Sequence, residues 1–292
     1  MTVGNSNRER IDQTQGIVGG MSLAEYRRLQ ERCVAKSEQI RERFAGRYRV
    51  SLHEPFVLAG DVDREKLDAL YEKVILPISQ ALQTCYFDRI PTEPITVMIF
   101  SGEKPFRIYA SEVDGYRTTA YSGYYRRSER KIVLDDSSGE GTLAHELTHS
   151  LAHFDFPHMP IWFDEGLASL HEECEFSDDN LKLIGFSNWR VNQLKLALKQ
   201  NRLPGLKAFF SEGMKRDRRE AIKYAYARYF CLYLQKRGLL SHFYRKLRAA
   251  NGKDETGIAT LKQLLHVSDL DGFEHQLVDW MHSISSENSP VF

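Results

Sequence analysis

The segment TLAHELTHSLAHF, residues 142–154, constrains the fold of this chain more than any other stretch. Its histidines recur every four residues, at His145, His149 and His153, and therefore lie on one side of a helix. Its large apolar residues fall on the opposite side, at Leu143, Leu147, Leu151 and Phe154. This spacing predicts an amphipathic helix, capped at Thr142, that packs its apolar side on a core and turns its histidines toward a polar site.

The histidine side of this helix carries the HExxH pattern. His145 and His149 stand about one helical turn apart, so both imidazoles can converge on one divalent ion. Glu146 lies beside them, where its carboxylate can take a proton from a metal-activated water. A pair of structural histidines is the alternative, and the amphipathic context of the pattern favours the metal site. His153 is interpreted as a structural histidine.

A catalytic zinc needs a third protein ligand and an open position for water, and two carboxylates compete for this role. Glu165 lies on the next predicted helix, in PIWFDEGLASL, and shares a face with Ser169 and Glu172. Asp155 has the spacing of the last ligand in HExxHxxGxxH proteins, but Ala152 replaces the glycine that lets the chain leave the helix there. Glu165 is therefore the favoured ligand, and Glu172 is a candidate anchor for a ligand imidazole.

Upstream of the histidine helix, strand and helix patterns alternate. Residues 47–60 alternate apolar and polar side chains, which predicts a half-buried strand. Apolar residues at every third or fourth position predict a helix that Asp63 opens and that runs through Leu82. Further strands are predicted at residues 95–100, 118–125 and 130–135. Beyond Asp135 almost every segment has a helical pattern, so we expect an α+β fold with a small mixed sheet and a helical C-terminal lobe.

Four parts are expected along the chain. They are a flexible tail over residues 1–20, a charged helix over 21–47, an α/β lobe over 48–156 that includes the histidine helix, and a helical lobe over 157–292. Ser22 followed by Glu25 is typical of a capping box at the start of the charged helix. The charges of this helix are interpreted as a solvated face.

Composition excludes several classes of partner. Forty Lys and Arg balance forty Asp and Glu, so no net field recruits nucleic acid or an anionic membrane. No apolar run approaches the roughly 18 residues of a membrane span, and the first 20 residues lack the apolar core of a secretory signal. The four cysteines are widely spaced, which argues against a disulfide framework. A cytoplasmic protein is therefore expected.

HELTH followed by PIWFDEGLASL resembles the gluzincin metallopeptidases, above all the peptidase MA-like group. The order of the upstream strands and the later segment YAYARYFCLYLQKRG are also similar, so the resemblance spans about residues 48–285. It implies a zincin-like fold in which His145, His149 and Glu165 bind one zinc ion. Glu146 would then act as general base and as proton shuttle to the leaving amine.

The resemblance also implies an oxyanion donor and a substrate strand. Tyr224 occupies the place of the aminopeptidase tyrosine that stabilises the oxyanion, with Tyr226 as a rival, although both can instead be core residues. An edge strand at Tyr121, Ser122 and Gly123 would pair with an extended peptide, unless Gly123 only forms a bulge. The segment that grips a free amino terminus in the aminopeptidase branch is absent, which favours an endopeptidase.

The sequence thus predicts a zinc metallopeptidase that hydrolyses peptide bonds of a peptide or protein substrate. A non-catalytic interaction protein, in which zinc only fastens two helices together, is the alternative. A structural zinc site does not need Glu146, so the enzyme is favoured.

Overall fold

The computed structural model describes residues 11–12, 17–18, 20–116, 122–212, 214, 218–250 and 252–284. The chain divides into two units. The first comprises Met1–Pro77 with Phe87–Gly139, and the second comprises Ile78–Tyr86 with Glu140–Phe292. The predicted lobe boundary after residue 156 does not coincide with this division, because the histidine helix belongs to the second, helical unit.

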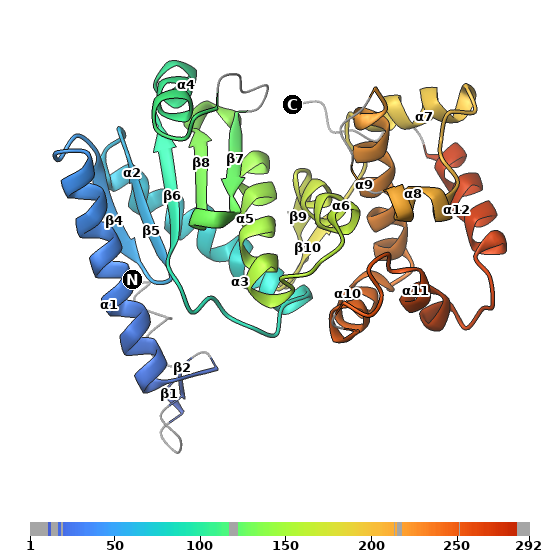
Figure 1. The fold of residues 1–292 in the computed structure, drawn as a ribbon, viewed down its shortest axis with the longest axis horizontal. Coiled ribbons are helices and arrows are strands. Elements are labelled where there is room, and N and C mark those ends of the chain that lie inside the picture. The colour runs from blue at the N-terminus through green and yellow to red at the C-terminus, as the bar shows by residue number, and fades with distance from the viewer. Residues whose placement is uncertain are drawn as a thin grey trace. The chain divides into compact units, whose positions relative to one another are not determined.

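The first unit contains a five-stranded mixed sheet with the strand order β4-β5-β6-β8-β7 (Figure 1). The strands are β4 (Arg49–His53), β5 (Phe56–Gly60), β6 (Ile95–Phe100), β7 (Gly123–Arg126) and β8 (Lys131–Asp135). β5, β6 and β8 run parallel, while β4 and β7 pair antiparallel with their neighbours. Every residue of β5, β6 and β8 is buried, as expected for central, parallel strands of a sheet.

Helices accompany this sheet. They are α1 (Leu23–Arg43), α2 (Arg64–Leu70) with the π-helical turn η1 (Tyr71–Ile75), and α4 (Glu103–Glu112). The capping box predicted for α1 is present, with Ser22 and Glu25 bonded reciprocally. α1 buries a single stripe of Leu29, Cys33 and Ile40 against the core, so its charges face solvent. Short strands β1 (Ile11–Asp12), β2 (Ile17–Val18) and β3 (Met21–Ser22) pair antiparallel ahead of it.

Two predicted strands of this unit have different bounds in the structure. Residues 47–60 form a hairpin of β4 and β5 rather than one strand, with Glu54 and Pro55 between the paired residues His53 and Phe56. The alternation of β4 passes into the continuous apolar run of β5 after a connection of only two residues, so the pattern alone does not reveal the reversal. The strand predicted over 118–125 begins at Gly123, and residues 118–121 lie outside the described ranges.

The second unit is built mainly from helices (Figure 1). They are α3 (Leu76–Cys85, from Ile78 on), α5 (Glu140–Asp155), α6 (Ile161–His171), α7 (Val191–Lys199), α8 (Leu206–Glu212), α9 (Glu220–Lys236), α10 (Leu240–Ala249), α11 (Ile258–Leu265) and α12 (Asp271–Ser283). α5 begins at Glu140, so Thr142 lies inside the helix and is not its cap as predicted. The hairpin of β9 (Cys174–Phe176) and β10 (Leu183–Gly185) interrupts the predicted helical run. Within the described ranges, no helix combines the length and apolar character that a membrane crossing requires.

Helix α9 is the centre of this unit. Its residues 225–234 are all buried, and α6 packs along it. Gly166 sets this contact, because a Cβ atom there would stand 2.8 Å from the carbonyl oxygen of Ala227 and 3.0 Å from Sγ of Cys231. Trp162, which also lies on α6, stacks on Phe210 of α8 with 4.4 Å between the ring centroids. Gly166 and Trp162 thus fix the position of α6, which carries Glu165.

We expect Gly166→Ala to lower the free energy of unfolding by about 1–3 kcal/mol, because the new methyl group meets backbone and sulfur atoms that cannot swing away. Urea titration followed by circular dichroism measures the change. Gly272→Ala is the matched control, because a Cβ there meets no atom within 4 Å and alanine is the better helix former. Equal stability of the two variants would contradict the close approach of α6 and α9.

Candidate metal centre

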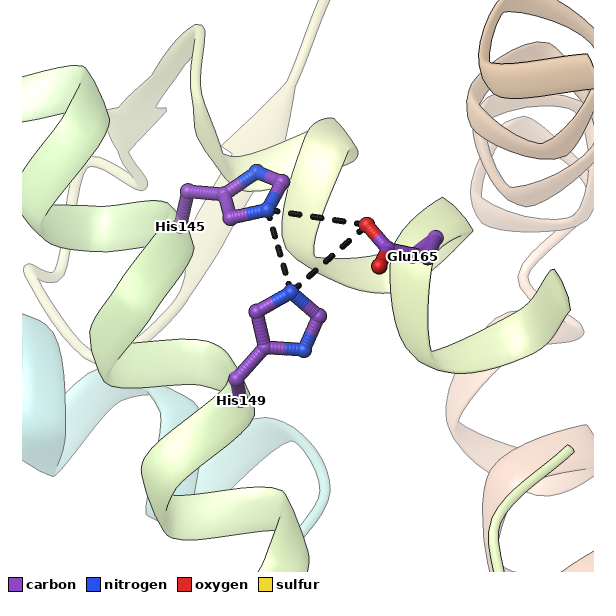
Figure 2. A group of neighbouring side chains, drawn as sticks. All are labelled: His145, His149 and Glu165. Carbon is purple, nitrogen blue, oxygen red and sulfur yellow. Dashed lines mark hydrogen bonds and ion pairs between the residues drawn. The ribbon is translucent and has the colours of Figure 1, made fainter. Parts of the chain in front are cut away.

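Three predicted ligands meet within the helical unit. α5 carries His145 and His149 one turn apart, and α6 carries Glu165 opposite them (Figure 2). The two Nε2 atoms are 3.0 Å apart, and each lies 3.7 Å from Oε2 of Glu165. All three side chains are largely buried, with 10–21% of each exposed. The structure therefore brings together one nitrogen from each imidazole and one carboxylate oxygen.

The dimensions of this triangle fit a zinc ion. In a tetrahedral site with bonds of 2.0–2.1 Å, ligand atoms stand about 3.3 Å apart. The observed separations of 3.0, 3.7 and 3.7 Å bracket that value, and the point equidistant from the three atoms lies about 2 Å from each. No backbone movement is needed to bring the three donors within bonding distance of one ion.

The other nitrogen of each ring faces a carboxylate. Nδ1 of His149 lies 2.8 Å from Oδ1 of Asp164, and Nδ1 of His145 lies 3.0 Å from Oε1 of Glu172. A carboxylate only accepts hydrogen bonds, so the neutral His149 ring carries its proton on Nδ1. Nδ1 of His145 is at ion-pair distance from Glu172 without a well-aligned hydrogen bond, and the negative charge of that carboxylate favours the proton on this nitrogen as well. Both Nε2 lone pairs then face one another and the Glu165 carboxylate. Three acceptors directed at one point repel each other unless a cation lies between them, and this donor set therefore fits a metal ion.

Asp164 holds a second imidazole. Its Oδ2 accepts from Nε2 of His153 at 3.0 Å, while its Oδ1 accepts from His149. His149, His153 and Asp164 also lie close enough to be a metal-binding group by distance alone. Because each oxygen of Asp164 already pairs with one imidazole, we interpret the three residues as a hydrogen-bond chain that orients His149. This agrees with the structural interpretation of His153.

Charge around the cluster favours a cation. Burial alone would lower the pKa of both imidazoles. Neighbouring carboxylates have the larger effect, so the pKa of His145 is raised and the pKa of His149 is raised further. Burial alone would raise the pKa of Asp164 and of Glu165. The neighbouring histidines have the larger effect, so the pKa of both carboxyl groups is lowered. The negative charge that favours a proton on these rings equally favours a metal ion between their Nε2 atoms.

Glu146 lies on α5 next to this cluster. Only 8% of the residue is exposed, and burial raises the pKa of its carboxyl group against the attraction of His145 and His149. A pKa raised toward neutrality suits a group that first accepts and then returns a proton. The structure thus places a buried carboxyl group with a raised pKa next to the ligand triangle, and its role as general base stays a prediction.

The rival third ligand has a different environment. Asp155 ends α5, is 1% exposed, and accepts hydrogen bonds from the Tyr244 hydroxyl at 2.9 Å and from Nη1 of Arg248 at 2.5 Å. Its two oxygens are therefore engaged in the core of the unit. The structure groups Glu165, and not Asp155, with the two histidines.

The two predicted oxyanion donors differ in accessibility. Tyr226 is fully buried, and its ring packs on Phe209 at 4.6 Å between centroids, so its hydroxyl cannot reach a substrate as one prediction required. Tyr224 is half-buried, and its ring lies 5.6 Å from the Arg190 guanidinium carbon. The core interpretation therefore describes Tyr226, and Tyr224 remains the candidate donor.

The predicted substrate strand belongs to the other unit. Tyr121 lies outside the described ranges, Ser122 is exposed, and Gly123 is the buried first residue of β7. Among the described residues, β7 lies at the edge of its sheet and pairs with β8. Its role in binding a peptide stays a prediction.

Two residues of the centre were missed by sequence reasoning. Asp164 carries a signal, since it directly precedes Glu165 in FDEG and a neighbouring carboxylate can reach the second histidine. Arg190 binds Glu172 through three contacts, from Nη2 to Oε1 at 2.7 Å and to Oε2 at 3.0 Å, and from Nε to Oε2 at 3.1 Å. No local pattern marks Arg190, because its partner is distant in the sequence.

Comparisons with known proteins include a weak structural similarity. No protein-family model matches the chain, and no curated protein matches it. Among solved structures, native yeast LTA4 hydrolase is similar with a TM-score of 0.41 and 13% sequence identity. The match covers 82% of this chain and 38% of that chain, so the present chain spans well under half of its length. Similarity of this extent does not assign the chain to a family.

Proposed function

We propose that this protein is a zinc-dependent metallopeptidase of the gluzincin type with a zincin-like fold. The observation that carries the proposal is the triangle of His145, His149 and Glu165, whose donor atoms share a point about 2 Å from each. The carboxylates of Asp164 and Glu172 contact the Nδ1 atoms of His149 and His145, and the buried Glu146 adjoins the site. A structural zinc site does not require such a glutamate.

Each residue has a defined task in peptide hydrolysis. A zinc ion held by the triangle would supply Lewis acidity to a water molecule and to the scissile carbonyl. Glu146 accepts the proton of the attacking water and passes it to the departing amine, so the proton count balances over one cycle. The Tyr224 hydroxyl donates a hydrogen bond to the developing oxyanion. Asp164 and Glu172 keep the two rings in the tautomer that presents Nε2.

The alternative, in which zinc only fastens helices, is less well supported. Asp164 on α6 already binds His149 and His153 on α5, so these helices are joined by hydrogen bonds without an ion. An ion that served only to fasten α5 to α6 would duplicate this link. It would also leave the burial of Glu146 without a purpose.

Metal removal tests the proposal. We expect the purified full chain to bind one zinc ion and to cleave a quenched fluorescent peptide library whose peptides are blocked at both ends. Cleavage should stop with 1,10-phenanthroline and return with one equivalent of zinc. Blocked ends restrict the assay to internal cleavage, as the predicted endopeptidase requires. A chain that binds zinc, unfolds when the metal is removed and cleaves no peptide would instead support the fastening role.

A further inference from the structure

Arg190 makes several hydrogen bonds to Glu172, the residue whose carboxylate faces the His145 ring. Its Nη2 donates to Oε1 of Glu172 at 2.7 Å and to Oε2 at 3.0 Å, and its Nε donates to Oε2 at 3.1 Å. Both side chains are mostly buried, with 14% of Arg190 and 19% of Glu172 exposed. A forked contact of this kind fixes the plane of a carboxylate as well as its position. Oε1, the oxygen held by Nη2, is the one that faces Nδ1 of His145.

Both oxygens of Glu172 therefore depend on Arg190. A carboxylate without the fork could rotate about its side-chain bonds, and Oε1 would then leave the ring of His145. Glu172 orients His145 only as long as Glu172 is itself oriented.

Arg190 is in turn held from three sides. Its guanidinium carbon lies 4.3 Å from the ring centroid of Trp189 and 5.6 Å from that of Tyr224, both within cation–π range. Its backbone N–H donates to Oδ1 of Asn188, whose own backbone N–H and carbonyl oxygen both bond the Tyr229 hydroxyl on α9. These hydrogen bonds tie Asn188 and Arg190, which precede α7, to the buried helix α9. They thereby fix the backbone position from which the Arg190 side chain extends to Glu172.

We propose that Arg190 is a positioning residue of the metal centre. Its fork holds Glu172 in the one orientation that fixes the His145 ring, and it does so without touching the ion. The inference rests on the proposed zinc site. Lysine cannot replace the fork, since an ammonium group is a point charge without fixed donor directions. The geometry therefore assigns the role to the guanidinium shape and not to its charge alone.

The test compares Arg190→Lys, Arg190→Gln and Glu172→Gln with the wild-type full chain. Zinc affinity is measured by chelator competition, and the visible absorption spectrum of the cobalt-substituted protein reports ligand geometry. We expect all three variants to lose about 10- to 100-fold in zinc affinity and to alter the cobalt bands. The double variant Arg190→Gln with Glu172→Gln should lose no more than Glu172→Gln alone, because Arg190 acts through Glu172.

Arg248→Gln is the matched control. It breaks another buried arginine–carboxylate pair of the same unit, with Asp155, and should lower thermal stability while leaving the zinc affinity and the cobalt spectrum unchanged. Arg190→Lys with wild-type zinc affinity and spectrum would overturn the inference, as would a full additional loss in the double variant. Both readouts are taken without turnover, so they test Arg190 even when no peptide is cleaved. A wild-type chain that binds no zinc would overturn the inference together with the proposed function.

Discussion

Glu146→Gln is expected to keep one zinc ion per chain and to lose about 100- to 10,000-fold in kcat/KM for peptide hydrolysis. The amide has nearly the shape of the carboxylate but cannot accept the proton of the attacking water. The ligand triangle does not include Glu146, so its geometry is retained. Because burial disfavours the ionised form of this residue, a neutral amide should also be tolerated in the fold. Zinc content is measured by atomic absorption, and turnover with the blocked peptide library.

Glu140→Gln is the control for this variant. It makes the same change at an exposed position in the first turn of the same helix, α5, and should leave zinc content and turnover as they are. If Glu146→Gln hydrolyses peptides at the wild-type rate with its zinc in place, another group is the base. Loss of zinc in Glu146→Gln would mean that the residue has a part in the metal site itself.

The part of the centre that lies on α5 could be predicted because helix geometry is local. A four-residue spacing places His145 and His149 on one side of any α-helix, whatever packs around it. The same reasoning on α6 correctly indicated that Glu172 faces the site, and the structure places it 3.0 Å from Nδ1 of His145. Arg190 could not be found in this way. Its contact depends on how the hairpin of β9 and β10 returns the chain to α6, which no local spacing encodes.

The fold could be predicted to a similar extent. β6 and the helix that begins after Asp63 lie where the sequence predicted them. Burial of a whole strand leaves an apolar run, and burial of one helix face leaves apolar residues at every third or fourth position. The hairpin of β9 and β10 was missed because its strands have three residues each, too few for a period to appear. For a related reason the sequence left open whether Tyr226 lies in the site or in the core. α9 is buried on all sides over residues 225–234, so amphipathic spacing does not distinguish its site-facing residues from core.

Replacing the third ligand, Glu165, is the second change for which we expect a large effect on zinc binding. We expect Glu165→Gln to weaken zinc binding by more than about 100-fold, since losing a direct ligand should cost more than losing an outer partner. The amide keeps the volume of the side chain but carries no negative charge toward the ion. Zinc affinity is again measured by chelator competition, and folding is checked by circular dichroism.

Asp155→Asn is the matched variant, because Asp155 is the other carboxylate whose spacing suits a third ligand. It should keep zinc affinity, because both Asp155 oxygens bind Tyr244 and Arg248 and not the cluster. It should instead lower the free energy of unfolding by about 3 kcal/mol, since Arg248 loses the charge of its buried partner. The two variants thus separate ligation from stability. The reverse pattern, with zinc lost in Asp155→Asn and retained in Glu165→Gln, would show that the ion is held from the end of α5 and not by α6.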